Sequence, residues 1–264
     1  MIESRHFFTL RNGTRQGGVL SPWLLARYVR DILACVASSG IGCTVGGMFI
    51  NILACADHVV LLAHLWCGLQ QLLDIVGQQC EIINMSLNTH KSVFMVFPPC
   101  DQFKVVVSSF PEFCANGKSL LYVSSFKYLG YIISSNNNDD ADIQREVSNM
   151  FIQTNLLSRK FHKNCSIAVK SALFRSYCIC MYYAALWSKF HVGILNKLRS
   201  SYNRCIKIFF GFNCRDSLTN ILVTLGLPSF DTVMANAAVS YSRLWNSCSN
   251  RIVMHLRQLS LRKV

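Results

Sequence analysis

The sequence predicts an α+β fold in two parts, a helix with antiparallel hairpins over residues 1–135 followed by an all-α basic region over residues 136–264. In the first part, short apolar runs rich in Ile, Val and Leu alternate with segments of helical periodicity. The second part contains only long helix-favouring segments. A polar, turn-prone run, Asn136–Asp140, lies between them and predicts a domain boundary near residues 135–142.

The first predicted helix, Leu24–Ser38, follows Ser21-Pro22 and has apolar residues at helical spacing. Gly40–Gly47 is expected to form turns because it is rich in glycine. The remaining predicted elements of the first part are a hairpin of Met48–Cys55 and His58–Ala63 around an Ala56-Asp57 turn, a helix over Cys67–Asn84, and strands at Ser92–Phe97, Lys104–Val107 and within Leu120–Ser134.

The second part is expected to be helical throughout. Its predicted helices are Ile143–Phe161, Ile167–Phe190, Leu195–Phe210, Ser217–Leu225 and Ser229–Leu259.

The composition indicates an ordered chain with an uneven charge. Hydrophobic residues make up 52% of it and charged residues 15%, so global disorder is not expected. Residues 1–142 hold 9 Lys and Arg against 10 Asp and Glu, a sum of −1, whereas residues 143–264 hold 17 against 3, a sum of +14. A polyanion such as RNA or DNA is the natural partner of such a surface. The alternative is a solvated basic face without a partner.

The 13 cysteines are interpreted as free thiols in an intracellular protein of the nucleus or cytoplasm, because the first residues carry no export signal. Their odd number and the lack of paired C-x-x-C spacings argue against a zinc framework. No charged residue occurs from Ile32 to Ala56, but glycines interrupt this interval. It therefore predicts turns and buried strands, and no membrane association is expected.

Asp57 and His58 lie between two apolar runs in "NILACADHVVLLA". One interpretation is an ordinary turn aspartate that bonds its own backbone. Two neighbouring motifs favour a functional role instead. "RNGTRQGGVLSP", Arg11–Pro22, places three glycines beside Arg and Gln immediately before a helix, which can bring backbone N–H groups close to a phosphate. "LNTHKS", Leu87–Ser92, adds a lysine after the next helix.

These motifs together resemble the reverse transcriptase of non-LTR, LINE-like retrotransposons. The resemblance is carried by "GTRQGGVLSP" before a helix, the apolar "CADH" hairpin, "LNTHKS" and "FKYLG", in that order. It is strong over residues 11–133 and looser over residues 170–230. It implies a partial polymerase palm over residues 1–135, followed by a helical, thumb-like basic region, and a family activity of RNA-templated DNA synthesis with RNA and DNA as partners.

The resemblance also implies roles for individual residues. Asp57 matches the first aspartate of the metal-binding turn, and His58 stands where a second aspartate is expected. The residues implied to line the nucleotide and template site are Arg15, Gln16, Gly17, Gly18, Ser21, Pro22 and Lys91. Tyr128, Leu129 and Gly130 would belong to the hairpin that supports the primer end.

The family holds two Mg²⁺ ions with carboxylates, since hard cations about 4 Å apart stabilise the charge that develops in nucleotidyl transfer. An imidazole at position 58 is a poor ligand for Mg²⁺. A further metal-binding aspartate is expected tens of residues before Gly13, where the only carboxylate is Glu3. The chain is therefore expected to be a truncated, inactive copy, dependent for activity on a chain that supplies the missing fingers and palm half. The alternative function is a non-catalytic nucleic-acid-binding module built on the basic helices.

Overall fold

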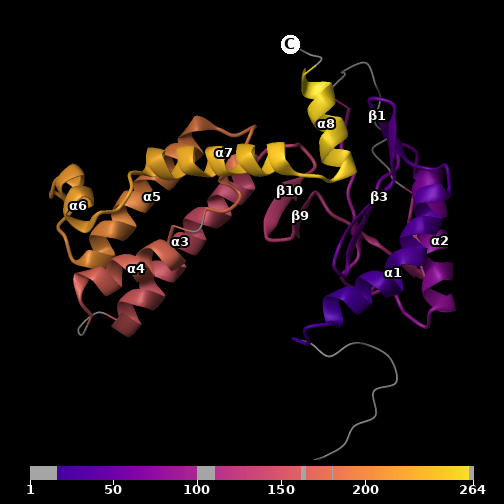
Figure 1. Ribbon diagram of the computed structural model, residues 1–264, viewed down its shortest axis with the longest axis horizontal. Coiled ribbons are helices and arrows are strands. Elements are labelled where there is room, and N and C mark those ends of the chain that lie inside the picture. The colour runs from indigo at the N-terminus through magenta and orange to yellow at the C-terminus, as the bar shows by residue number, and fades with distance from the viewer. Residues whose placement is uncertain (1–16, 100–110, 162–164, 180, 262–264) are drawn as a thin grey trace, which may run out of the picture. The chain divides into compact units, whose positions relative to one another are not determined.

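The computed structural model describes residues 17–99, 111–161, 165–179 and 181–261 (Figure 1). The chain divides into two compact units. The first contains the described residues 17–94 and 111–122, and the second contains residues 95–99 and 123–261. The expected strand Lys104–Val107 lies outside the described residues.

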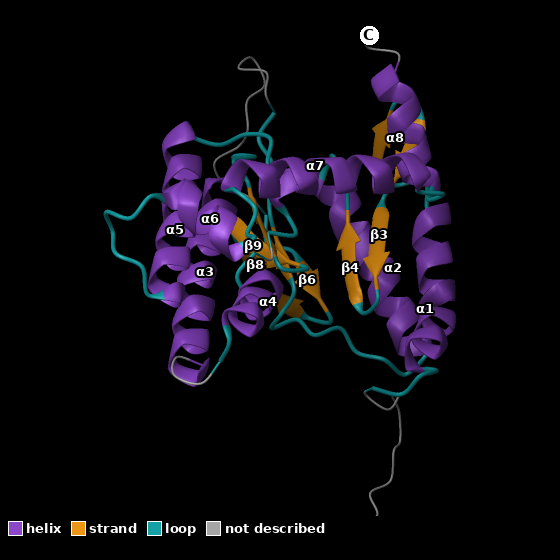
Figure 2. Cartoon of the chain, turned by 60° about the vertical axis from the view of Figure 1, so that its left-hand side comes forward, coloured by secondary structure: helices purple, strands orange, loops and turns teal. Residues whose placement is uncertain are grey.

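Two helices, α1 (Ser21–Ser38) and α2 (Trp66–Ile82), lie side by side in the first unit (Figures 1 and 2). Both confirm predicted helices. α1 begins three residues before the predicted start because Pro22 is favourable in the first turn. Their shared core consists of Ile32, Val36, Leu72, Val76 and Cys80.

Two consecutive antiparallel hairpins connect these helices. β1 (Cys43–Val45) pairs with β2 (Met48–Ile50), and β3 (Ile52–Cys55) pairs with β4 (His58–Leu61). The predicted hairpin around Ala56-Asp57 is confirmed. The prediction of one strand over Met48–Cys55 was wrong, because the run is divided at Asn51 into β2 and β3. The prediction that Gly40–Gly47 forms only turns was also wrong, because this segment contains β1, which Gly46 and Gly47, both with positive φ, connect to β2.

The remaining strands of the first unit are short. β5 (Val93–Phe94) pairs in parallel with β8 (Leu121–Tyr122), and β6 (Cys114–Ala115) pairs with β7 (Lys118–Ser119) through an Asn116-Gly117 turn. The strand predicted over Ser92–Phe97 is thus limited to two residues. A second small core surrounds Phe113 and Leu120.

The second unit begins with a hairpin, β9 (Ser125–Tyr128) and β10 (Tyr131–Ser134), which confirms the two strands predicted around residues 127–130. The helical elements follow it: α3 (Asp140–Phe161), α4 (Ile167–Tyr177), the 3₁₀ turn η1 (Ala184–Leu186), α5 (Val192–Phe210), α6 (Leu218–Leu225), α7 (Phe230–Ser247) and α8 (Arg251–Leu261).

Two long predicted helices are each divided in the structure. Ile167–Phe190 ends as a helix at Tyr177, because the segment after it bonds to the start of α3 through Trp187, Ser188 and Lys189. Ser229–Leu259 breaks after Ser247. There Arg257 donates to the backbone carbonyls of Trp245, Asn246 and Cys248 at the end of α7, and the Asn250 side chain accepts from the first turn of α8.

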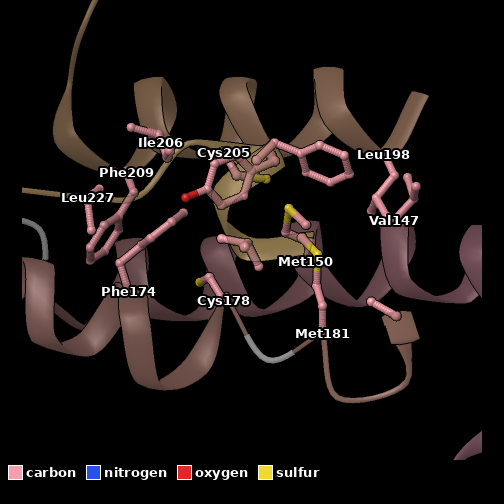
Figure 3. Close-up of a cluster of buried hydrophobic side chains, with 14 of the residues drawn as sticks. Val147, Met150, Phe174, Cys178, Met181, Leu198, Cys205, Ile206, Phe209 and Leu227 are labelled. Carbon is pink, nitrogen blue, oxygen red and sulfur yellow. The ribbon is translucent and has the colours of Figure 1, made fainter. Parts of the chain in front are cut away.

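The core of the second unit lies between α3, α4 and α5. Figure 3 shows side chains from these three helices directed into one space, among them Val147, Met150, Phe174, Leu198, Cys205, Ile206 and Phe209, together with Cys178, which directly follows α4. The ring of Phe174 stacks on that of Phe209 with centroids 5.8 Å apart. Tyr202 lies in the same core with no exposed surface, and burial raises the pKa of its hydroxyl.

The chain therefore has the predicted mixture of helices and antiparallel hairpins. Among the described residues, no single helix is both long and apolar enough to cross a bilayer. Only α6 and α7 taken together reach that length and composition, and they are bent by 55°.

Candidate functional site

Asp57 and His58 lie at the tip of the β3–β4 hairpin (Figure 2). Asp57 occupies the turn and His58 is the first residue of β4, directly opposite Cys55. The Asp57 Oδ1 atom lies 3.9 Å from His58 Nε2, and the two side chains are 78% and 57% exposed. Ala56, the other turn residue, has a φ of 53°, a conformation that costs a residue with a Cβ roughly 1–2 kcal/mol. The turn therefore presents one carboxylate and one imidazole to solvent.

Asn51 fixes the base of this hairpin. Its side-chain amide donates to the backbone carbonyl oxygens of Val36, at the end of α1, and of Ile41. The backbone carbonyl of Asn51 accepts from the Leu62 amide at 2.8 Å. The side chain is only 3% exposed. A Cβ on Gly42 would lie 2.4 Å from that of Asn51, so only glycine fits beside it. Sequence reasoning missed this residue, although a lone amide between apolar strands was a signal.

The strands are buried only near their base. Ile52 and Leu61 pack against the core between α1 and α2, whereas Leu53 and Val59 are 37% and 42% exposed. The prediction of buried strands within Ile32–Ala56 is therefore wrong for Leu53–Cys55, which are exposed.

The glycine-rich motif leads into α1. Gly17 has a φ of 77°, which glycine adopts without strain, and the Gly18 carbonyl accepts from the Ser21 amide at 3.2 Å. Pro22 occupies the first turn of the helix. Arg15 and Gln16, the two side chains expected to meet a nucleotide or template, lie outside the described residues.

Lys91 lies in the turn after α2, where its backbone amide donates to the side chain and the carbonyl of Asn88. Its side chain is exposed. No hydrogen bond or ion pair links it to Asp57 within the described part of the chain. The structure places Lys91 and Asp57 in the same unit, but not in contact with each other.

The residues at the turn do not fit a two-magnesium site. Mg²⁺ requires near-octahedral oxygen coordination, and the turn offers one carboxylate. Across residues 17–99, 111–161, 165–179 and 181–261 there is no group of three His, Cys, Asp or Glu side chains that could hold a metal ion. Asp57 alone can contribute one ligand.

Tyr128, Leu129 and Gly130 lie in the second unit, at the turn of the β9–β10 hairpin. Beside them is a buried polar cluster at the start of α3. Asp142, with no exposed surface, accepts hydrogen bonds from the Ile132 amide at 3.0 Å, from Arg145 Nε at 2.8 Å and from Trp187 Nε1 at 2.9 Å.

Asp139 continues this cluster. It accepts from the Tyr131 hydroxyl and from the amides of Ser188 and Lys189 at 2.7 and 2.8 Å. Burial, together with the hydrogen bond to Asp139, raises the pKa of Tyr131. The sequence predicted a polar turn at Asn136–Asp140, so these structural aspartates were missed. Their position just ahead of an apolar helix was the available signal.

Several basic side chains of the second unit, exposed or partly buried, are bonded within it. Lys197 donates to Gln144, Arg199 to Asp231, and Lys207 to two backbone carbonyls. Of the aromatic residues interspersed with them in the sequence, Trp187 and Tyr202 are core residues, whereas Tyr182 is 79% exposed. Tyr183, the fourth aromatic residue of this set, is partly buried, so two of the four belong to the core.

Comparison with known proteins identifies the first half of the chain. The family model described as reverse transcriptase (RNA-dependent DNA polymerase) matches residues 2–133. A Pol polyprotein from the type-2 retrotransposable element R2DM of Drosophila melanogaster is 33% identical over 126 residues, which is 47% of this chain. A Pol polyprotein from the type-1 retrotransposable element R2 of Popillia japonica is 38% identical over 85 residues, 32% of this chain.

In both cases the matched segment covers only 12% of the relative's length. Members of the matched family use divalent metal ions and act on RNA and DNA. The motif order, the Asp57 hairpin and these matches agree with one another. The chain belongs to the reverse transcriptase (RNA-dependent DNA polymerase) family, in the group carried by non-LTR retrotransposable elements.

Proposed function

We propose that this chain forms part of the reverse transcriptase domain of a non-LTR retrotransposon, whose family activity is RNA-templated DNA synthesis. The observation that carries the proposal is Asp57 at the tip of a tight hairpin that is fastened to α1 through Asn51. The family match over residues 2–133 includes this hairpin. Residues 1–135 would form the partial palm and residues 136–264 the helical, thumb-like region. An intracellular location, in nucleus or cytoplasm, stays a prediction.

The remaining site residues take their proposed roles from the motifs. The residues facing the nucleotide and template would be Arg15, Gln16, Gly17, Gly18, Ser21, Pro22 and Lys91. The start of α1 supports this role. Gly17 and Gly18 have no side chains, so a bound strand could approach their backbone closely. The turn of Tyr128, Leu129 and Gly130 would support the primer end.

The chain by itself is proposed to lack polymerase activity. Asp57 is the one carboxylate at the turn, and His58 adds no negative charge where the family places a second one. Loss of part of an electrostatic site of this kind typically costs about 10²–10³ in rate for a single group. Productive binding of Mg²⁺ would need carboxylates from a further polypeptide segment, which a partner chain could supply together with the fingers and the other palm half.

Primer extension tests this proposal. The 264-residue chain is incubated with a DNA primer on an RNA template, with Mg²⁺ or Mn²⁺, beside Asp57→Ala and His58→Asp variants. No incorporation is expected from the chain or from Asp57→Ala. Incorporation that disappears in Asp57→Ala would overturn the claim of inactivity. Nucleotide incorporation by His58→Asp, but not by the parent chain, would show that the imidazole at position 58 alone causes the inactivity.

A second candidate function is nucleic-acid binding without catalysis, which the excess of 17 basic over 3 acidic residues after position 142 favours. Lys160 and Lys189 are exposed and have no hydrogen-bond or ion-pair partner for their ammonium groups among the described residues. Binding should weaken steeply with salt, and Lys160→Gln or Lys189→Gln should each reduce the salt slope by about 1.

Arg27→Gln is the matched control for these variants. Arg27 is an exposed cation of α1 in the other unit, so its replacement removes the same charge from a different surface. Fluorescence anisotropy with a labelled RNA–DNA duplex measures the slope from 50 to 200 mM salt. If Arg27→Gln reduces the salt slope as much as Lys160→Gln does, the result would contradict binding by the helical region.

A further inference from the structure

The turn of the β9–β10 hairpin has positive φ at both central residues, although the first of them is leucine. Gly46-Gly47 and Asn116-Gly117 close two hairpins with positive φ at both central residues, and glycine and asparagine accept this conformation readily. Leu129-Gly130 has the same geometry, with φ values of 48° and 92°, but begins with leucine. A leucine in this region persists only where its surroundings hold it there.

Tyr183 supplies that restraint. Its hydroxyl donates to the backbone carbonyl of Leu129. A Cβ on Gly130 would lie 2.5 Å from the Tyr183 oxygen, so the tyrosine occupies the space that glycine leaves free. The backbone around Tyr183 is anchored in turn, because Met181, two positions earlier, and Ala184, the next residue, belong to the core of the second unit.

The cluster around Asp139 and Asp142 holds the start of β10, the strand that follows this turn. Asp142 accepts the Ile132 amide of β10 and the Trp187 indole, and Asp139 accepts the Tyr131 hydroxyl. The rings of Tyr131 and Tyr183 lie with centroids 5.9 Å apart. The turn and the start of β10 are thus linked to one segment, residues 183–189, directly through Tyr183 and by way of Asp139 and Asp142.

These contacts determine which face of the hairpin remains open. Tyr131 is opposite Tyr128 and lies against the core, so the alternate pair of Lys127 and Ile132 belongs to the other face. The Lys127 side chain is exposed. The hairpin therefore offers a cationic side chain and a rigid turn on a face that the helical core does not occupy.

We propose that Tyr183 is a positioning residue, which locks the Leu129-Gly130 turn so that the hairpin meets the end of a primer strand in one fixed orientation. The inference rests on the proposed function for its nucleic-acid partner, a primer–template duplex. Its structural basis is the hydrogen bond to Leu129 and the close fit at Gly130. Tyr183 itself touches no reacting atom, since it acts through the turn.

The first test measures, without nucleic acid, how strongly Tyr183 restrains the hairpin. Hydrogen–deuterium exchange in the peptide covering residues 125–134 is compared for the 264-residue chain, Tyr183→Phe and Tyr177→Phe. Tyr183→Phe should raise the exchange rate of this hairpin roughly 2- to 10-fold, the range set by loss of one hydrogen bond. Tyr177 is an exposed tyrosine of α4, so its variant loses the same hydroxyl without touching the hairpin. Equal exchange rates of this peptide in all three proteins would overturn the claim that Tyr183 restrains the turn.

The second test measures positioning. A DNA primer with 2-aminopurine at its 3′ end is annealed to an RNA template, and the emission of the analogue is recorded with each protein at saturation. The expected result is an emission change with the parent chain and Tyr177→Phe. With Tyr183→Phe, the signal should return at least halfway to that of the free duplex, while the Kd changes less than about twofold, as expected for phosphate contacts elsewhere.

The outcomes separate the two proposals. If the parent chain binds no duplex or leaves the emission unchanged, the role proposed for the hairpin fails and the inference fails with it. If the parent chain changes the emission and Tyr183→Phe does so equally, only the positioning role is overturned. A proportional loss of affinity, emission change and melting temperature in Tyr183→Phe also overturns it, because a general loss of structure would then explain the effect.

Discussion

Asn51 shows how one polar residue can orient a functional turn. Its amide is buried and bonded to two carbonyl oxygens, of Val36 and Ile41. Replacing it with aspartate removes both donors and directs a carboxylate at two acceptors. We expect Asn51→Asp to lower the free energy of unfolding by roughly 3 kcal/mol or more at pH 7, in urea denaturation followed by circular dichroism. Much of the loss should disappear near pH 4, where the protonated carboxyl can donate.

Asn196→Asp is the control, because Asn196 is an exposed residue of α5. Its replacement makes the same chemical change on the surface. There we expect the free energy of unfolding to change by about 0.5 kcal/mol or less. Similar losses in the two variants would refute a special role for the buried amide.

Glu146 illustrates a buried charge that opposes stability. It is 4% exposed, and burial raises the pKa of its carboxyl even though Arg145 Nη2 lies 3.1 Å away. A carboxyl whose pKa is higher in the folded state than in the unfolded state favours folding below the unfolded pKa. That contribution is lost as the pH rises through the folded pKa.

Glu146→Gln should therefore raise the melting temperature at pH 7, by a few degrees if the gain is about 1 kcal/mol. The difference from the parent chain should vanish below about pH 4, where the glutamate is protonated in both states. Thermal melts from pH 4 to pH 8 measure this difference. A Glu146→Gln variant that melts lower at pH 7 would mean that the ion pair with Arg145 outweighs the cost of burial.

At the scale of elements, the Leu129-Gly130 turn combines a favourable and an unfavourable residue. Leu129 has a φ of 48° and is 42% exposed, so little packing offsets the strain. Asparagine tolerates this conformation and precedes glycine in the preferred turn of this type. Leu129→Asn should raise the free energy of unfolding by about 1 kcal/mol in urea denaturation. The same exchange at exposed Leu156 in the middle of α3 should be destabilising, since asparagine is a poorer helix former.

The elements that the sequence predicted best are those decided by local chemistry. Pro22 and the apolar spacing after it fix α1, and Ala56-Asp57 separates β3 from β4. The failures have tertiary causes. The predicted helix Ile167–Phe190 contains no glycine or proline that would end it at Tyr177. Its end depends instead on the hydrogen bond from Trp187 to Asp142, 45 positions earlier in the chain.

The site could be predicted to a similar extent. A motif placed Asp57 on a hairpin turn, and the structure confirms that placement. Asn51 and Tyr183 belong to no motif. Their importance depends on contacts with Val36 and Leu129, which lie 15 and 54 positions away, and a single sequence does not encode such distances visibly.

At the scale of the whole molecule, each unit has a core of its own. The core residues around Leu72 belong to residues 17–94, and those around Leu198 belong to residues 123–261. Because no buried cluster in the described residues draws on both units, we expect two transitions in differential scanning calorimetry. In a variant whose other three tryptophans, Trp23, Trp66 and Trp245, are replaced by phenylalanine, the emission of Trp187, which is 8% exposed, should follow the transition of the second unit.

A matched pair of variants assigns the transitions. Leu72 and Leu198 both have no exposed surface, and truncation of either to alanine should cost about 2–5 kcal/mol. Leu72→Ala should lower the transition that leaves the Trp187 signal unchanged, and Leu198→Ala should lower the one that Trp187 reports. A single transition that both variants lower equally would show that the two cores unfold as one cooperative body. The hairpin of residues 125–134 would then be coupled to the Asp57 turn through the fold itself.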